Sequence, residues 1–274
     1  MVSCRSFFKF TSLILALSLA ACGSAPLTGL TSTPTIMLGP KATLPVNPTL
    51  PVTPTTAATQ KGNGDCTNPF FPVSSGATWS YASTGSISGD YNYTRSVSGL
   101  GGTGFTTNDA FNTGLVRTLN WTCDKGNLTY LPPTGNPSLS SSSMVMVVES
   151  VNSTGYSIPF SISDGDTWSE DLMINGIYVQ GSEKKGTGVS EVTTNCSALG
   201  TESVKVPAGT FEAVKITCHS VHVTTVTLKG KTNPPVTTTQ DSIQWFVQGV
   251  GVVQMANSGD GGDETIQLTQ YSLP

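Results

Sequence analysis

The sequence is poor in charged residues and lacks any cluster of positive charge. Charged residues make up 11% of its 274 residues, against about 25% in a typical soluble domain. Lys+Arg total 13 against Asp+Glu 17, and the isoelectric point is about 5.1. A phosphate backbone requires clustered lysine and arginine. We therefore expect no nucleic-acid partner.

Histidine and closely spaced cysteine pairs are also scarce, which limits the chemistry. The chain has two histidines, His219 and His222, and no Cys-x-x-Cys pair. On a strand, residues three apart point to opposite faces, so the histidines would not hold one metal ion together. No serine-nucleophile motif, phosphate-binding loop or carboxylate pair stands out. We expect no metal, no cofactor and no catalytic residue, with an envelope-polymer hydrolase as the alternative.

Residues 1–21 have the features of a signal peptide. Arg5 and Lys9 precede an apolar run over 10–21, which is shorter than the roughly 20 residues that span a bilayer. The run ends in Leu19-Ala20-Ala21-Cys22. This matches a bacterial lipobox, in which the cysteine after the cleavage site takes a diacylglycerol. The sequence predicts lipidation of Cys22 and membrane attachment through its acyl chains, with an ordinary secretory signal as the alternative.

A linker over 22–64 is expected to separate this anchor from the folded domain. Residues 23–64 contain 7 Pro and 10 Thr and have no acidic or aromatic residue. Such a stretch forms no core and favours extended polyproline II, so we expect a semi-rigid stalk. The expected location is the extracytoplasmic side of the cell envelope. The residue after Cys22 is Gly23, not the Asp that retains many lipoproteins at the inner membrane. This favours the outer membrane in a host with two membranes.

Residues 65–274 are predicted to form one all-β domain. Runs of β-branched and aromatic residues alternate with Gly, Asn, Asp and Ser clusters about every 8–12 residues. The expected architecture is a curved antiparallel sheet, a half-barrel or a sandwich. The predicted strands are 78–83, 91–97, 116–123, 128–131, 144–151, 177–183, 189–196, 203–206, 213–221, 223–228, 237–247, 252–256 and 265–271.

Two short patterns predict local structure within this domain. Pro207-Ala208-Gly209 combines one fixed φ with one permissive φ, which predicts a tight turn flanked by Val206 and Phe211. Residues 75–80 also resemble residues 164–169. Each copy places a glycine just before a tryptophan that begins a strand, so both rings are expected to cap one end of the core. Chance similarity is the alternative explanation of this repeat.

Four cysteines remain in the domain after Cys4 leaves with the signal peptide and Cys22 is lipidated. They are Cys66, Cys123, Cys196 and Cys218. An even number in an exported chain predicts two disulfides, and four cysteines allow three pairings. Proximity across neighbouring strands favours Cys196 with Cys218 around the predicted turn. That pairing leaves Cys66 to join Cys123.

Three segments resemble a family of uncharacterised bacterial lipoproteins, some of them called TapB-like. The segments are Phe70-Phe71-Pro72-Val73 with 76–81 around Trp79, then 204–213 with Pro207, Gly209 and Phe211, then 245–253 with Trp245, Gly249 and Gly251. The resemblance implies a curved antiparallel β-sheet domain and brings no catalytic residue. The same segments also fit a purely structural role, namely a buried tryptophan, a hairpin, and a strand that bends at two glycines.

Together these features predict a surface-tethered lipoprotein whose β domain binds a ligand or contributes to envelope architecture without catalysis. One alternative is a carrier or sensor of an apolar ligand, which requires an apolar cavity lined by several strands. The expected partners are the membrane, through the lipid anchor, and an apolar ligand, a glycan or an envelope protein. Glycan binding would require an exposed aromatic platform formed by Trp79, Tyr81, Trp121 or Trp168.

Overall fold

The computed structural model describes residues 64–87, 89–134, 144–180, 183–260 and 262–274. The predicted signal peptide, Cys22 and nearly all of the linker lie outside these residues. A short 3-10 helix precedes the strands, and every strand pair is antiparallel. The predicted all-β fold class is therefore confirmed. The elements are η1 (Gly64–Cys66), β1 (Thr78–Thr84), β2 (Tyr91–Ser98), β3 (Gly104–Phe111), β4 (Val116–Asp124), β5 (Asn127–Leu131), β6 (Met144–Gly155), β7 (Thr167–Gln180), β8 (Glu183–Val206), β9 (Gly209–Leu228), β10 (Lys231–Thr232), β11 (Val236–Val247), β12 (Gly251–Gly259) and β13 (Glu264–Ser272).

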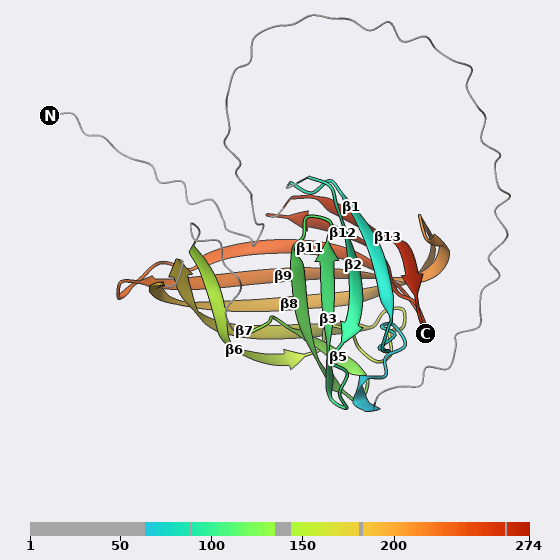
Figure 1. Ribbon diagram of the computed structural model, residues 1–274, viewed down its shortest axis with the longest axis horizontal. Coiled ribbons are helices and arrows are strands. Elements are labelled where there is room, and N and C mark those ends of the chain that lie inside the picture. Colours follow the sequence, from blue (N-terminus) through green and yellow to red (C-terminus); the bar gives the residue numbers. More distant parts are fainter. Residues whose placement is uncertain (1–63, 88, 135–143, 181–182, 261) are drawn as a thin grey trace, which may run out of the picture.

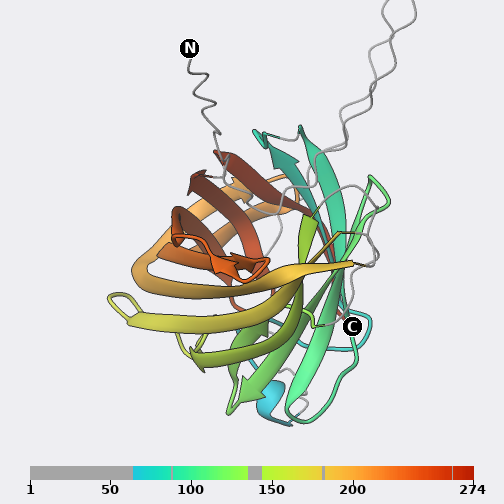
Figure 2. The same ribbon diagram turned by 90° about the vertical axis from the view of Figure 1, so that its left-hand side faces the viewer.

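The strands form one curved sheet. Their order is β5-β4-β3-β2-β1-β13-β12-β11-β9-β8-β7-β6, with β10 added to β9. The sheet curls until its two edges approach, so that β1–β5 stand opposite the long strands (Figure 2). An isolated bridge joins Leu128 in β5 to Ile158, which follows β6, and their backbone groups exchange hydrogen bonds of 2.9 and 3.0 Å. These bonds connect the two ends of the sheet.

Side chains fill the inside of the curl at one end. The ring of Phe71 lies 5.5 Å from Trp79, 5.6 Å from Phe105 and 5.3 Å from Trp121 between ring centroids. Strands β7, β8 and β9 extend well beyond the crossing strands β2 and β3 (Figure 1). Among the described residues, the hydrophobic core includes none of β8 before Cys196 and none of β9 after Cys218. We call the part of the long strands within this cluster the packed end and the part beyond it the uncovered end.

Two disulfides fasten the packed end. Cys66–Cys123 ties the start of the domain to β4, and Cys196–Cys218 joins β8 to β9. These are the pairs that proximity favoured in the sequence. The cysteines are separated along the chain by 57 and 22 residues, respectively. Closing loops of this length restricts the unfolded chain and stabilises the fold by about 3–4 kcal/mol per bridge.

The segments that resemble the lipoprotein family meet around Trp79. Its indole Nε1 donates to the carbonyl of Val250 at 2.6 Å, and the amide of Gly249 donates to the carbonyl of Pro69 at 2.8 Å. Gly249 and Gly251 have φ values of 75° and 107°, which favour glycine. A Cβ on Gly251 would lie 3.5 Å from Trp79 Nε1. The turn between β11 and β12 is therefore seated on the buried tryptophan, and Trp245 is anchored separately by donating to Glu202 at 2.6 Å.

The hairpin between β8 and β9 turns more tightly than predicted. Val206 pairs with Gly209, so the turn contains Pro207 and Ala208 alone, and Phe211 pairs with Val204 further along the strands. The prediction that Phe211 flanks the turn is wrong because Gly209, at φ 145°, already pairs as the first residue of β9. The amide of Ala208 donates to the carbonyl of Leu268 at 3.1 Å. This bond docks the turn on β13.

Several strand boundaries also differ from those predicted. Strand β3 was not predicted, and the predicted breaks within β8 and β9 do not occur. At the predicted break in β8, the strand stays continuous, and its register with β9 shifts between Ala198 and Thr201, with Gly200 at φ 79°. The two similar segments do adopt the same local structure, since Trp79 and Trp168 each follow a turn glycine and occupy the second position of a strand. Trp79 lies in the core, whereas Trp168 packs against it and is partly buried.

Candidate functional site

A carboxylate between two arginines lies on the inner face of strands β2, β3 and β4. Asp109 pairs in register with Arg95 on one side and with Arg117 on the other. Alternation along each strand places these three side chains on the same face as buried Tyr93 and Trp121. The sheet therefore directs all three charges toward its interior.

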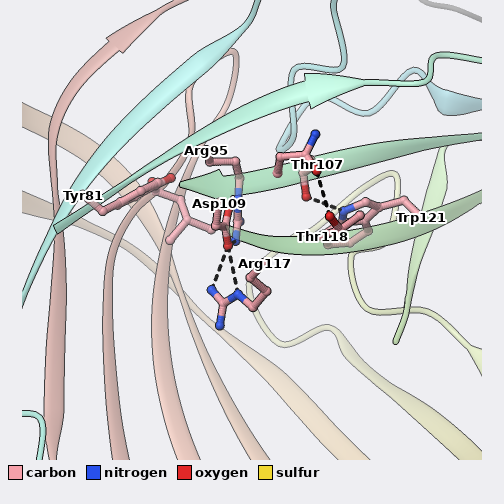
Figure 3. Close-up of polar contacts among 9 residues, drawn as sticks. Tyr81, Arg95, Thr107, Asp109, Arg117, Thr118 and Trp121 are labelled. Carbon is pink, nitrogen blue, oxygen red and sulfur yellow. Dashed lines mark hydrogen bonds and ion pairs between the residues drawn. The ribbon is translucent and has the colours of Figure 1, made fainter. Parts of the chain in front are cut away.

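The geometry of this ion cluster is closely defined (Figure 3). Arg95 donates from Nε to Oδ1 of Asp109 at 2.7 Å and from Nη2 to Oδ2 at 2.9 Å. Arg117 donates from Nε and Nη2 to Oδ2 at 3.1 and 2.7 Å. The Asp109 side chain is 0% exposed, that of Arg95 15% and that of Arg117 50%. Arg117 is therefore the member of the cluster that solvent or a ligand can reach.

The two arginines decide the charge state of Asp109. Burial alone would raise the pKa of the Asp109 carboxyl, but the hydrogen bonds from Arg95 and the charges of both arginines outweigh burial and hold the pKa below its usual value. The guanidinium of Arg117 also lies 5.3 Å from the Phe111 ring centroid and 6.0 Å from that of Tyr93. One carboxylate facing two guanidiniums leaves the cluster with one surplus positive charge.

A second carboxylate, Glu170 in β7, is buried on the inner face of the sheet. Ser157 Oγ donates to Glu170 Oε1 at 2.6 Å and accepts from the amide of Tyr130 at 2.7 Å. Burial raises the pKa of Glu170 to about 6, the hydrogen bond from Ser157 lowers it, and the charge of Asp171 raises it. The pKa of Tyr130 is raised by burial and responds to the charges of both Arg117 and Glu170. Ser157 therefore links Glu170 to the backbone of β5.

Beyond Glu170 the inner face continues along the long strands past the described hydrophobic core cluster, starting with Leu172 at 8% exposure. The inner residues of β7, β8 and β9 pair in rows across the three strands. The first row is Leu172, Val192 and His222, the second is Ile174, Ser190 and Thr224, and the third is Gly176, Gly188 and Val226. These side chains are buried or half-buried, whereas the intervening residues point outward, as with Met173 at 45% exposure. We call this surface the open inner face, comprising Leu172, Ile174, Ser190, Val192, His222, Thr224 and Val226.

Aromatic and sulfur side chains lie over the far end of the open inner face. A Cβ on Gly188 would lie 2.5 Å from Tyr178 Cε2 and 3.4 Å from Met146 Sδ, and a Cβ on Gly176 would lie 3.0 Å from Met146 Cε. The two facing glycines thus leave room for Tyr178 and Met146. Burial raises the pKa of the Tyr178 hydroxyl.

The residues considered for glycan or metal binding do not come together in the structure. Trp79, Tyr81 and Trp121 are 2%, 5% and 8% exposed, so these three do not form an exposed aromatic platform. His219 bonds to Asp241 at 2.7 Å on the outer face, while His222 lies on the inner face, where burial lowers its pKa. Across the described ranges, no group of three or more His, Cys, Asp or Glu could hold a metal ion.

Two surface hollows are present, and neither is the enclosed apolar cavity that an apolar-ligand carrier was expected to have. One of about 250 Å³ lies over β1, β2 and β3. The other, of about 290 Å³, lies at the tip of the β7–β8 hairpin, where β8 begins and β9 ends, and is lined in part by Lys184, Lys185 and Lys229. The sequence analysis predicted no such gathering of lysines, because the fold alone brings residues 184–185 beside residue 229.

The ion cluster was also missed from the sequence, although a signal for it exists. Arg95 alternates with Tyr93 and Val97, and Asp109 alternates with Phe105 and Thr107, so both charges occupy positions of the buried face. Charges at such positions require buried partners. Finding those partners requires the register of β2, β3 and β4.

Comparisons with known proteins found a matching family and two similar solved structures. The sequence pattern of the DUF3108-like family matches residues 117–264. No protein with a curated description matches the chain. Two crystal structures are similar, a candidate exported protein with a YmcC-like fold from Bacteroides fragilis and a candidate lipoprotein from Parabacteroides distasonis. Both are 14% identical with TM-scores of 0.42, and the matches cover 76% and 75% of this chain and 100% and 99% of theirs.

The described residues also bear on membrane spanning. Within them, no helix has the length and apolar character needed to cross a bilayer.

We predict that Asp109→Asn destabilises the domain at neutral pH. The substitution leaves Arg95 buried without a negative partner, which costs about 3 kcal/mol or more. Because the folded-state pKa of Asp109 lies below the unfolded value of about 4, its contribution is present above that pH and is lost as pH falls through the folded value. Urea unfolding at pH 7 and pH 3 measures this, and exposed Asp124→Asn is the control. Equal stability of D109N and the wild type at pH 7 would contradict the prediction.

We also predict that Glu170→Gln stabilises the domain above pH 6. The folded-state pKa of Glu170 is about 6, so its favourable contribution is present below the unfolded value and is lost as pH rises through 6. At pH 8 the variant should exceed the wild type by about 2 kcal/mol, and at pH 4.5 the two should be nearly equal. Thermal unfolding across this range tests it, with exposed Glu191→Gln as the control. The idea fails if the difference does not change with pH.

Proposed function

The chain belongs to the DUF3108-like family, and we propose that it is a non-catalytic lipoprotein of the cell envelope whose β domain carries or senses an apolar ligand on its open inner face. The observation that carries this proposal is the uncovered part of β7, β8 and β9. Their inner side chains continue past the Cys196–Cys218 disulfide, where the core ends. An uncovered apolar face on a folded domain is typical of a binding surface.

The pattern of side chains on this face favours an apolar ligand. Leu172, Ile174, Val192 and Val226 all lie on the inner side of their strands, where they can bury surface against a ligand inside the curl. Burying apolar surface is worth about 25 cal/mol per Å². Serine and threonine hydroxyls between them pair with one another across strands, as Ser190 does with Thr224 at 3.1 Å. Their polar groups are therefore satisfied without a polar ligand.

The state of the interior carboxylates supports a non-catalytic role. Both oxygens of Asp109 accept hydrogen bonds from arginine, which keeps the carboxyl ionised and occupied. Glu170 Oε1 accepts from Ser157. A general acid or base needs access to a substrate proton, and Asp109, with both oxygens engaged, is not free for that task. The more specific likeness to TapB-like proteins remains a prediction.

The proposed envelope location rests on the lipobox around Cys22 and on the linker that follows. We predict that Cys22→Ser releases the protein from the membrane fraction into the soluble envelope fraction. The thioether-linked acyl chains are the proposed anchor, because the domain itself is acidic and gains little from anionic lipid surfaces. Fractionation and intact mass measure both effects, with Cys4→Ser as the control. Membrane retention and an unchanged mass of C22S would contradict the anchor.

Native mass spectrometry of the chain purified from its own envelope tests ligand binding. We predict extra mass that is lost on denaturation. Ile174→Asn, on the open inner face, should reduce the bound ligand severalfold, because a buried amide without a partner is costly there. Its neighbour Met173→Asn, on the outer face, is the matched control. A wild-type protein without bound ligand, or equal occupancy in both variants, would count against the proposal.

A further inference from the structure

We propose that the ligand is a long-chain amphiphile with an anionic headgroup, and that Arg117 binds this headgroup at the packed end of the open inner face. The proposal rests on the proposed function, since it names the class of ligand for the same surface. It assigns the apolar tail to the long strands and the charge to the ion cluster.

The argument begins with the unequal roles of the two arginines. Arg95 alone forms a bidentate pair with Asp109, using both carboxylate oxygens, and its side chain is 15% exposed. A bidentate pair of this kind satisfies the charge of one carboxylate. Arg117 is the second guanidinium on the same carboxylate and remains 50% exposed. Its positive charge is therefore the surplus charge of the cluster.

Arg117 also has a free hydrogen-bonding edge. Its Nε and Nη2 donate to Asp109, and among the described residues Nη1 takes part in no hydrogen bond. Figure 3 shows the third nitrogen of the guanidinium directed away from Asp109. A guanidinium held in place by one carboxylate is well suited to bind a second carboxylate or a phosphate. The aromatic rings of Phe111 and Tyr93 further restrict its position.

Arg117 and the start of the open inner face both face the interior of the curl. On the same face of β4 as Arg117, Trp121 contacts the Tyr130 ring at 5.9 Å, and the Tyr130 amide donates to Ser157, which donates to Glu170. Glu170 in turn precedes Leu172 on the same face of β7, where the open inner face begins. The run from Leu172 to Tyr178 spans six residues, or about 20 Å of extended strand. A long alkyl chain can lie along this length with its charged end at Arg117.

The carboxylates Glu264 and Glu170 are each held by a serine hydroxyl rather than by Arg117. Glu264 accepts from Ser83 Oγ at 2.6 Å on the side of β1 and β13. Glu170 accepts from Ser157, and its raised pKa lets it take a proton near pH 6. The lysines at the hairpin tip lie at the opposite end of the open inner face, since Gly186 pairs with Leu228 there. They form a second positive region that the experiment must separate from Arg117.

The test compares oleate with oleyl alcohol, which has the same alkyl chain and no charge. The protein is the mature chain from residue 22 carrying Cys22→Ser, which removes the acyl anchor and the need for detergent. Isothermal titration should show oleate binding about tenfold or more tightly than oleyl alcohol, since charge-assisted hydrogen bonds are stronger than neutral ones. Arg117→Gln should weaken oleate binding about tenfold or more and leave oleyl alcohol unchanged. Arg117→Lys should retain part of the preference.

The controls separate the headgroup assignment from the proposed function. Lys205→Gln removes one exposed positive charge from the end of β8 and should change neither affinity. Arg117→Gln should keep its fold, because Arg95 still pairs with Asp109, and thermal unfolding verifies this. If both probes bind equally and R117Q has no effect, the headgroup proposal is overturned while ligand binding stands. If the double variant Lys184→Gln, Lys229→Gln loses oleate instead, the headgroup belongs at the hairpin tip. If neither probe binds, the proposed function itself fails.

Discussion

The curl of one continuous antiparallel sheet is the constraint on which the rest of the structure depends. Each strand bonds to its neighbours, and the bridge between Leu128 and Ile158 connects the two edges. Curling gives every strand an inner face that must be filled or left to a ligand. The aromatic cluster around Phe71 fills one end. The long strands β7, β8 and β9 continue past this aromatic cluster, because their backbone hydrogen bonds are made to one another and do not require a filled interior.

The buried ion cluster follows from the same constraint. Register places Arg95, Asp109 and Arg117 side by side on the inner face, where the cost of removing charges from water is high. Buried ion pairs are weak evidence for stability, since well-packed apolar residues often replace them without loss. A pair suffices to neutralise Asp109, so the second arginine exceeds what charge balance of this cluster requires. The positive charge of this second arginine is easier to explain by the binding of an anionic ligand than by a contribution to folding stability.

Much of the fold could be predicted from the sequence where apolar residues alternate. Strands β1, β2 and β4 begin at the predicted residues, because tyrosine, tryptophan and valine mark their buried faces. Strand β3 escaped prediction because Thr106, Thr107, Asn108 and Asp109 occupy its centre. The join of two predicted strands into β8 also escaped, because polar residues and Gly200 lie at its bulge. In both cases cross-strand pairing overrides local composition.

The candidate site was less predictable for a related reason. Its residues come from different strands, and their proximity depends on register rather than on spacing along the chain. Leu172 and Val192 look like ordinary core positions in the sequence, and only the fold shows that their rows lie beyond the described hydrophobic core cluster. Arg117 likewise begins a strand next to exposed Val116 and reads as a surface charge. Its register with Asp109 places it on the inner face, where its half-exposed guanidinium lies beside the rings of Tyr93 and Phe111. A ligand with an apolar chain and one negative charge is the simplest molecule that satisfies this guanidinium and the open inner face at once.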